Sequence, residues 1–194
     1  DGDGNIDLVF GEINACLDAS AYCTTLMRND GAGHFTIDNS RLPQSLVGRA
    51  SGYTAFLDAN HDGYPDIYVG YGETLNGDND MLLLNDGKGY FREAPAGTIP
   101  PRSGGAQCAT LVGAVMDLNH DGYPDIIRSF ACNRYTDGGY QVLINRRDGT
   151  FADATAQWLP GTLIISRDSA SQASVTCTPV NWTGGAVVTV PMNP

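Results

Sequence analysis

The sequence predicts an all-β protein in which one antiparallel sheet motif is repeated. Short apolar segments alternate with turns rich in glycine and aspartate along most of the 194 residues. No stretch shows the 3.6-residue periodicity of an amphipathic helix. Three sequence landmarks also recur in the same order, which is the signature of internal repeats. With 42% hydrophobic and 17% charged residues, the chain has the composition of a folded protein.

The first landmark is an Asp-Gly-x-x-Asp sequence that leads into apolar residues. It begins at Asp3, Asp62 and Asp121, each 59 positions after the one before. The second landmark is a turn that ends in an aromatic residue, and the third is a Leu-Pro or Ile-Pro pair. The turn occupies 25–35, 82–91 and 142–151, and the pair occupies 42–43, 99–100 and 159–160.

The second copy of the repeat predicts four strands, near 52–58, 66–71, 81–85 and 90–94. Val, Ile, Tyr, Phe and Leu dominate these segments, and an Asp-Gly hairpin signal separates the last two. Four antiparallel strands in about 60 residues is the size of one β-propeller blade. Phenylalanines recur with the repeat and are expected in the core: Phe35, Phe91 and Phe151.

The repeats divide the chain into about three blades and a partial fourth. A propeller needs four to eight blades to close, so we expect an incomplete propeller, either as part of a longer chain or as a subunit that exchanges strands. The final segment lacks an acidic loop and is interpreted as a degenerate partial blade, a linker or a donated strand. The expected units are blade 1 at 1–50 with its first strand missing, blade 2 at 51–101, blade 3 at 102–160 and the last segment at 161–194.

The net charge of −11 restricts the classes of partner. Nucleic acids and anionic membranes would be repelled. No run of 18 apolar residues is present, so membrane insertion is not expected. The acidic balance is suited to cations.

The acidic loops are the candidate metal sites. Clustered like charges repel one another, and a bound cation removes this repulsion, while all-oxygen ligands favour calcium. An EF-hand is rejected because loop position twelve is Val69 in one copy and Arg128 in the other, and the flanks are strand-like. The expected ligands are Asp58, Asn60, Asp62, Tyr64 (by its carbonyl) and Asp66 in the second repeat; Asp117, Asn119, Asp121, Tyr123 (by its carbonyl) and Asp125 in the third; and Asp1, Asp3, Asn5 (by its carbonyl) and Asp7 in a partial first site.

The sequence D-x-N-x-D-G-Y-P-D before an apolar strand, followed by LLLNDGKGYF, resembles the FG-GAP/VCBS repeat family. This family includes the blades of integrin α-subunit propellers. The resemblance covers roughly residues 1–160. It implies a propeller fold, one calcium per loop between the first two strands of a blade, and extracellular adhesion or glycan binding.

Five cysteines favour an oxidising, extracellular location. Since no C-x-x-C pair occurs, zinc and thioredoxin chemistry are not expected. A local disulfide is expected for Cys16–Cys23. Antiparallel strands running back from the third acidic loop would bring Cys108 and Cys132 together at the far end of the hairpin, so a Cys108–Cys132 bond is expected too. Cys177 remains, either free or with a partner outside the chain.

No catalytic constellation is visible in the sequence, so an enzyme is not expected. Asp78 and Asp80 are interpreted as a polar loop tip, and Asn181 begins an N-glycosylation sequon. We expect a secreted, calcium-binding propeller segment that serves adhesion, cell-surface assembly or carbohydrate binding. Its expected partners are calcium and a glycan or extracellular protein. The alternatives are a structural subunit of an extracellular filament that self-associates, and an accessory propeller of a larger carbohydrate-active or lipolytic enzyme.

Overall fold

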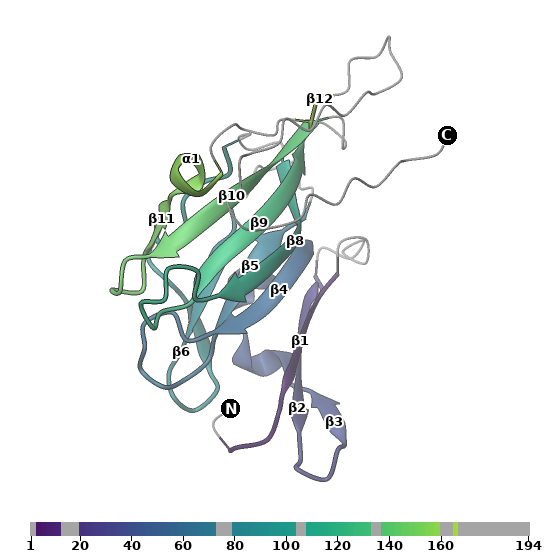
Figure 1. Cartoon of the computed structure of the whole chain (residues 1–194). Helices are drawn as coiled ribbons and strands as arrows, with labels where there is room; N and C mark the ends of the chain where they lie inside the picture. Colours follow the sequence, from purple (N-terminus) through teal and green to yellow (C-terminus); the bar gives the residue numbers. More distant parts are fainter. Residues whose placement is uncertain are drawn as a thin grey trace, which may run out of the picture.

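The chain forms three antiparallel β-sheets that follow one another in sequence in a computed structural model (Figure 1). The prediction of an all-β chain with repeated antiparallel sheets is confirmed. Within the described part of the chain, no helix has the length and apolar character needed to cross a membrane. The structure describes residues 3–12, 20–72, 79–103, 108–132, 137–159 and 165–166.

The second sheet has four strands in the order β4-β5-β6-β7. Each boundary lies within one residue of the position expected from the sequence. All six residues of β5 are buried, so this strand lies in the interior of the molecule. The strands are β4 (Ser51–Leu57), β5 (Asp66–Tyr71), β6 (Met81–Asn85) and β7 (Phe91–Glu93).

The third sheet repeats this arrangement in the order β11-β10-β9-β8, and a short fifth strand, β12, pairs with β10. One helical turn, α1 (Thr155–Trp158), follows β11. Apart from β12, the predicted last segment at 161–194 lies outside the described residues. The strands are β8 (Cys108–Met116), β9 (Asp125–Cys132), β10 (Asp137–Asn145), β11 (Phe151–Asp153) and β12 (Ile165–Ser166).

The first sheet has three described strands in the order β1-β2-β3. Strand β1 corresponds to β5 and β9, because each of the three follows an acidic loop and they are spaced by the 59-residue repeat. In the described residues β1 pairs with β2 alone, whereas β5 pairs with both β4 and β6. The elements are β1 (Leu8–Gly11), β2 (Thr24–Asn29), β3 (Phe35–Ile37) and two 3-10 turns, η1 (Asn39–Arg41) and η2 (Gln44–Leu46).

The strand register is the same in each repeat, which fixes the geometry of the loops. Leu57 pairs with Asp66 on either side of the second acidic loop, and Met116 pairs with Asp125 on either side of the third. A register shift also recurs at one place, between Ser51 and Tyr53 in β4 and between Thr110 and Val112 in β8. Similar sequence therefore produces similar loops and similar strand irregularities.

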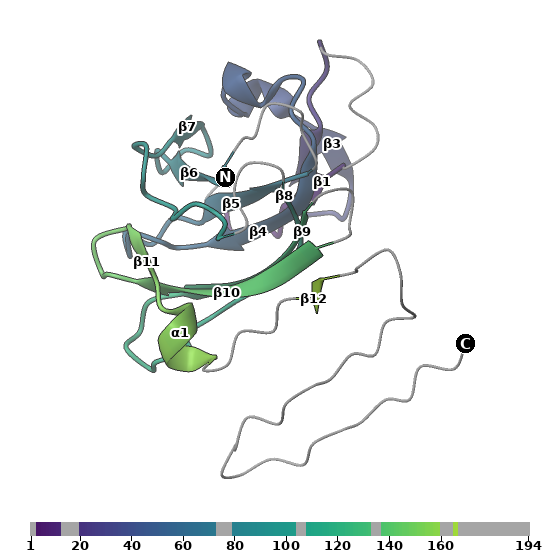
Figure 2. The same cartoon turned by 90° about the horizontal axis from the view of Figure 1, so that it is seen from above.

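The sheets pack face to face, with β4 and β5 between β1 on one side and β9 and β10 on the other (Figure 2). A glycine sets the spacing at both junctions. A β-carbon at Gly70 would lie 2.6 Å from Thr110 Cγ2, and one at Gly11 would lie 2.8 Å from Ser51 Oγ. Because glycine has no β-carbon, the strand can approach its neighbour closely.

Two apolar clusters fill the junctions between the sheets. The first contains Leu26, Leu42, Leu46, Ile67, Val69, Tyr71, Leu83 and Phe91, and the second contains Leu57, Ala59, Tyr68, Leu82, Ile99, Ile126, Leu143 and Phe151. Phe91 and Phe151 are buried as expected, but the prediction is wrong for Phe35, which is 38% exposed. Phe91 and Phe151 each pack against residues of the preceding sheet, and the described residues include no sheet before the first.

Candidate metal centre

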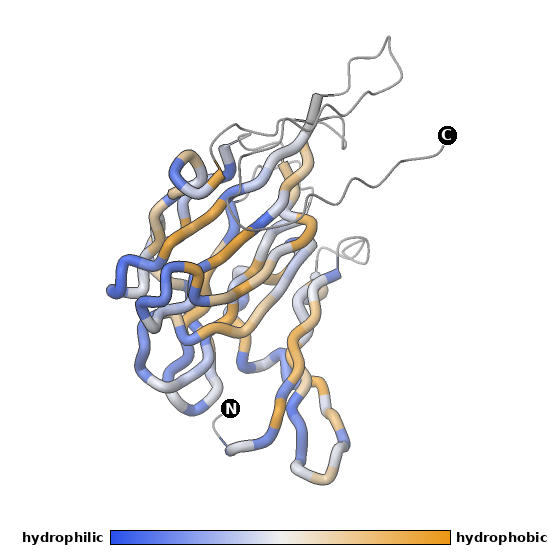
Figure 3. The backbone as a smooth tube through the Cα atoms, in the orientation of Figure 1, coloured by the Kyte–Doolittle hydropathy of each residue, from blue (hydrophilic) through white to orange (hydrophobic). Residues whose placement is uncertain are grey.

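The acidic loops of the second and third sheets lie next to each other at one end of the strands. The ring of His61 packs against the ring of Tyr123, with 4.7 Å between their centroids. Hydrophilic turns gather at this end, beyond strands that are largely apolar (Figure 3). The loops are therefore positioned by the hairpins β4–β5 and β8–β9.

The second loop is held by hydrogen bonds from its own backbone to its carboxylates. Asp58 accepts from the backbone N–H of Asp62 at 3.0 Å and of Gly63 at 2.9 Å, and Asp62 Oδ1 accepts from Tyr64 N–H at 2.9 Å. His61 and Gly63 have φ values of 59° and 88°. Histidine tolerates this left-handed conformation better than β-branched residues do, and glycine adopts it without strain.

The third loop has the same geometry. Asp117 accepts from the backbone N–H of Asp121 at 3.0 Å and of Gly122 at 2.9 Å. Asp121 Oδ1 accepts from Tyr123 N–H at 2.9 Å, and His120 has a φ of 58°. The near-identical sequences of the two loops thus give one local structure.

The last aspartate of each loop is buried and anchors the loop to the next strand of its sheet. Asp66 accepts from Ala59 N–H at 3.1 Å and from Asn85 N–H at 2.8 Å. Burial is the main cause that raises the pKa of Asp66 to about 6, and the negative charges of Asp62 and Asp58 raise it further. Asp125 makes the corresponding bonds with Leu118 and Asn145 at 2.9 and 2.8 Å.

The first loop shows two of the same hydrogen bonds within its described residues. Asp3 Oδ1 accepts from Asn5 N–H at 2.8 Å, and this bond lowers the pKa of Asp3. Asp7 Oδ1 accepts from Asn29 N–H at 3.0 Å, as Asp66 does from Asn85. Asp1, the expected leading ligand, lies outside the described residues.

The chemistry of the loops suits a hard cation, but the carboxylates do not form a closed cage. Among the residues that the structure describes, no group of three or more His, Cys, Asp or Glu side chains is arranged to hold a metal ion. The carboxylates are directed toward backbone N–H groups, and Asn60 Nδ2 donates to Asp62 Oδ2 at 2.8 Å. The donor set still fits calcium, because it is all oxygen and its negative charges repel one another. The calcium ligands remain a prediction.

Arg147 is a site residue that the sequence analysis did not identify, since it lies in the landmark turn at 142–151 and not in an acidic loop. Arg147 Nε donates to Asp121 Oδ2 at 2.9 Å. The hydrogen bond from Tyr123 N–H, followed by the contact with Arg147, lowers the pKa of Asp121. Aligning the repeats would have shown the difference, since the positions equivalent to Arg147 are Gly31 and Gly87.

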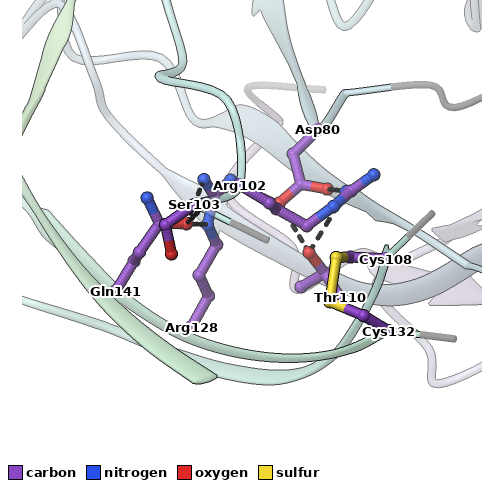
Figure 4. The surroundings of a disulfide bond; sticks show 8 residues. All are labelled: Asp80, Arg102, Ser103, Cys108, Thr110, Arg128, Cys132 and Gln141. Carbon is purple, nitrogen blue, oxygen red and sulfur yellow. Dashed lines mark hydrogen bonds and ion pairs between the residues drawn. A yellow bond between two sulfur atoms is a disulfide. The ribbon is translucent and has the colours of Figure 1, made fainter. Parts of the chain in front are cut away.

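The opposite end of the third sheet carries a disulfide. Cys108 and Cys132 face each other across β8 and β9 and are bonded, as the hairpin geometry predicts, with an S–S distance of 2.02 Å (Figure 4). The other cysteine predictions involve Cys16 and Cys177, which lie outside the described residues. Asn181, the candidate glycosylation site, lies outside them as well.

A buried ionic cluster joins the second and third sheets beside this disulfide (Figure 4). Asp80 accepts from Arg102, from Arg128 Nη1 at 2.6 Å and from Thr110 Oγ1 at 2.7 Å, and the Tyr68 hydroxyl donates to it too. The interpretation of Asp80 as a polar loop tip is wrong, because its side chain is 0% exposed. The sequence signal for this buried cluster was Arg128. This arginine replaces an apolar residue of the repeat, because the equivalent position in β5 is Val69. Asp78 lies outside the described residues.

Comparison with known proteins supports this repeat structure. The model of the FG-GAP-like repeat family matches residues 1–69 and 58–128. Each match begins at one acidic loop and ends in the strand that follows the next. The chain belongs to the FG-GAP-like repeat family. No curated protein matches the chain. The sequence resemblance to FG-GAP repeats is therefore confirmed over the two matched spans.

Proposed function

We propose that this FG-GAP chain is a calcium-stabilised segment of an extracellular β-propeller that serves adhesion. The observation that carries the proposal is the repeated loop. Asp58 and Asp62 lie close enough to Asp66 for their negative charges to raise its pKa. The same arrangement of hydrogen bonds recurs in the third loop. Bound calcium would relieve this repulsion.

The residues that would hold the ion are the loop carboxylates, the amide oxygens of Asn60 and Asn119, and the carbonyls of Tyr64 and Tyr123. Calcium would supply positive charge that joins the two strands flanking each loop. The chain itself supplies the turn, through the left-handed conformations of His61 and Gly63. Metal binding and folding are then coupled, because the loop is formed only in the native state.

The extracellular assignment is supported by the disulfide between Cys108 and Cys132, since such bonds persist in oxidising compartments. The propeller assignment is supported by the four-stranded antiparallel order β4-β5-β6-β7 and by its repetition in β8 to β11 of the next sheet. The role in adhesion is drawn from the family and is a proposal for this chain. A non-catalytic role agrees with loops whose carboxylates are already engaged in holding the turns.

Thermal unfolding with and without calcium tests this function. The purified chain is unfolded in calcium at about 100 times its dissociation constant and again in excess chelator. A ligand that binds only the native state at this excess contributes about 2.7 kcal/mol, which raises the midpoint of a protein of this size by about 5–10 °C. An unchanged midpoint would contradict structural calcium sites.

Matched variants locate the effect. Asp62→Ala removes a loop carboxylate, and Asp86→Ala removes an exposed aspartate that accepts from Lys88 N–H in a neighbouring turn. Each variant loses one negative charge and two hydrogen bonds to the carboxylate, from Tyr64 and Asn60 in one case and from Lys88 and Tyr90 in the other. The calcium-induced shift should shrink in Asp62→Ala and persist in Asp86→Ala. Equal shifts in the two variants would place the calcium outside the acidic loops.

A further inference from the structure

The third sheet has one apolar face that no described sheet covers (Figure 2). Side chains alternate between the two faces of a strand, so Val112, Ala114 and Met116 of β8 share one face. Val115 belongs to the apolar cluster between the second and third sheets, so its neighbours Ala114 and Met116 point away from the second sheet. Val112 is 58% exposed and Met116 is 45% exposed.

The strand register continues this face across β9 and β10. Ala114 pairs with Ile127, and Val112 and Tyr140 both pair with Ser129. Directly paired residues of an antiparallel sheet lie on the same face. Tyr140 is 41% exposed. We call this surface the outward face, and it is made of six uncharged residues: Val112, Ala114, Met116, Ile127, Ser129 and Tyr140.

The same positions of the repeat form a sheet junction in the second sheet. One period of 59 residues earlier, Met116 corresponds to Leu57 and Ile127 corresponds to Tyr68. Leu57 and Tyr68 are 5% and 0% exposed, and both belong to the cluster that joins the second sheet to the third. The outward face therefore continues an interface that this chain already uses, and side chains of this kind pack against a neighbour there.

The chain leaves the third sheet beside this face. Strand β12 ends at Ser166, which pairs with Asp137 of β10. The segment from 167 to 194 follows, and it is roughly three times as long as the nine-residue β8. Since a strand rises about 3.3 Å per residue, this length is enough to cross the outward face twice.

The composition of this segment matches the outward face. Residues 169–194 include no Asp, Glu, Lys or Arg, although the chain as a whole has a net charge of −11. Such a segment covers an uncharged surface without burying an unpaired charge. Ala186, Val188 and Val190 also alternate with other residues, which is the pattern of a strand with one buried side.

We propose that residues 169–190 dock on the outward face of the third sheet and cover Val112, Met116 and Tyr140. The partner of this surface is then a segment of the same chain. Attachment through β12 keeps the segment close to the face, at an effective concentration on the order of millimolar, so that a modest contact is enough to hold it. This inference goes beyond calcium binding and does not depend on it.

Hydrogen–deuterium exchange of the full chain, read by mass spectrometry, tests the proposal. Amides of 169–190 should exchange at least about tenfold more slowly in the chain than in a synthetic peptide of the same residues. Equal rates in the chain and the peptide would overturn the proposal. Protection that grows with protein concentration would show that a second copy supplies the segment, and it would overturn docking within one chain.

A pair of variants locates the docking surface. Val112→Asp places a charge on the outward face, and Ile37→Asp changes an isoleucine of β3 in the first sheet that is 61% exposed. Protection of 169–190 should fall at least about tenfold in Val112→Asp, because a buried unpaired charge is strongly disfavoured, and should persist in Ile37→Asp. Amides of the fully buried β5 report whether each variant is folded. Equal protection of 169–190 in the two folded variants would refute the outward face as the docking site.

Discussion

Arg147 donates from Nε to Asp121 Oδ2 at 2.9 Å, so a fixed positive charge lies on a predicted calcium ligand of the third loop. Arg147 has a φ of 66°, in the left-handed region where the first and second repeats have glycine. The third loop therefore differs from the second in charge although its own sequence is nearly identical. In the proposed calcium-bound state, the ion and the guanidinium would compete for this one carboxylate.

Replacing Arg147 with glycine should strengthen calcium binding by the third loop. The gain should be roughly two- to fivefold at low ionic strength, since exposed ion pairs are weak and screened by salt. Glycine accepts the positive φ, so the turn should keep its shape. Terbium luminescence titration in an Asp3→Ala, Asp62→Ala background measures this loop by itself. Arg146→Gly is the control, and an equal gain there would show that only net charge matters.

In the calcium-free protein, the contribution of Asp66 to stability should be lost as the pH rises from about 4 to 7. The pKa of Asp66 is about 6 in the folded chain against an ordinary value of 3.8, because burial disfavours the charged carboxylate. The folded state therefore binds this proton more tightly than the unfolded state, and its contribution to stability is lost as the pH rises through 6. Urea unfolding at several pH values measures the trend.

Calcium and the variant Asp66→Asn provide the controls for this pH dependence. Saturating calcium should favour the ionised carboxylate and so reduce or reverse the trend. Asp66→Asn cannot titrate at this position, and its stability should change less between pH 4 and 7 than that of the natural sequence. Identical slopes for the two proteins would show that Asp66 is not the responsible group.

Removing the charge of Asp80 should destabilise the fold strongly. Asp80→Asn leaves Arg102 and Arg128 buried without their carboxylate, and breaking such a buried cluster costs about 3–5 kcal/mol. The free energy of unfolding in urea measures the loss. Asp38→Asn is the matched control, because its partner Arg41 is partly exposed, and that pair is expected to contribute about 0.2–1 kcal/mol. Similar losses in both variants would contradict a special role for the buried cluster.

Loss of the Cys108–Cys132 disulfide should lower stability without weakening calcium binding. The sequence separation of 24 residues corresponds to about 3.5 kcal/mol in the chain-entropy account. The bond lies at the opposite end of β8 and β9 from the third loop. Thermal unfolding of Cys108→Ala, Cys132→Ala should show a lower midpoint, while terbium titration should give the same affinity. A large loss of affinity would indicate that the cross-link acts on the loop.

The sequence was sufficient for the repeat, the strands of the second sheet and the Cys108–Cys132 pairing, because each depends on local pattern and register. It was insufficient for the burial of Asp80, whose partners Arg102 and Arg128 lie 22 and 48 positions away and meet it only after the sheets pack. Phe35 shows the same limit. Phe35 occupies the same position of the repeat as Phe91. Phe91 is buried because it packs against residues of the preceding repeat, and this contact between sheets is not encoded in the local pattern.

The two junctions between sheets differ in kind. Neutral hydrogen bonds such as Thr54 Oγ1 to the Val9 carbonyl, and an apolar cluster, join the first sheet to the second. The second and third sheets share an apolar cluster and Asp80 with its arginines as well. Amide protons of β2 should therefore exchange with deuterium sooner than those of β5 and β9, so that the chain opens from its amino-terminal side while the remainder stays folded.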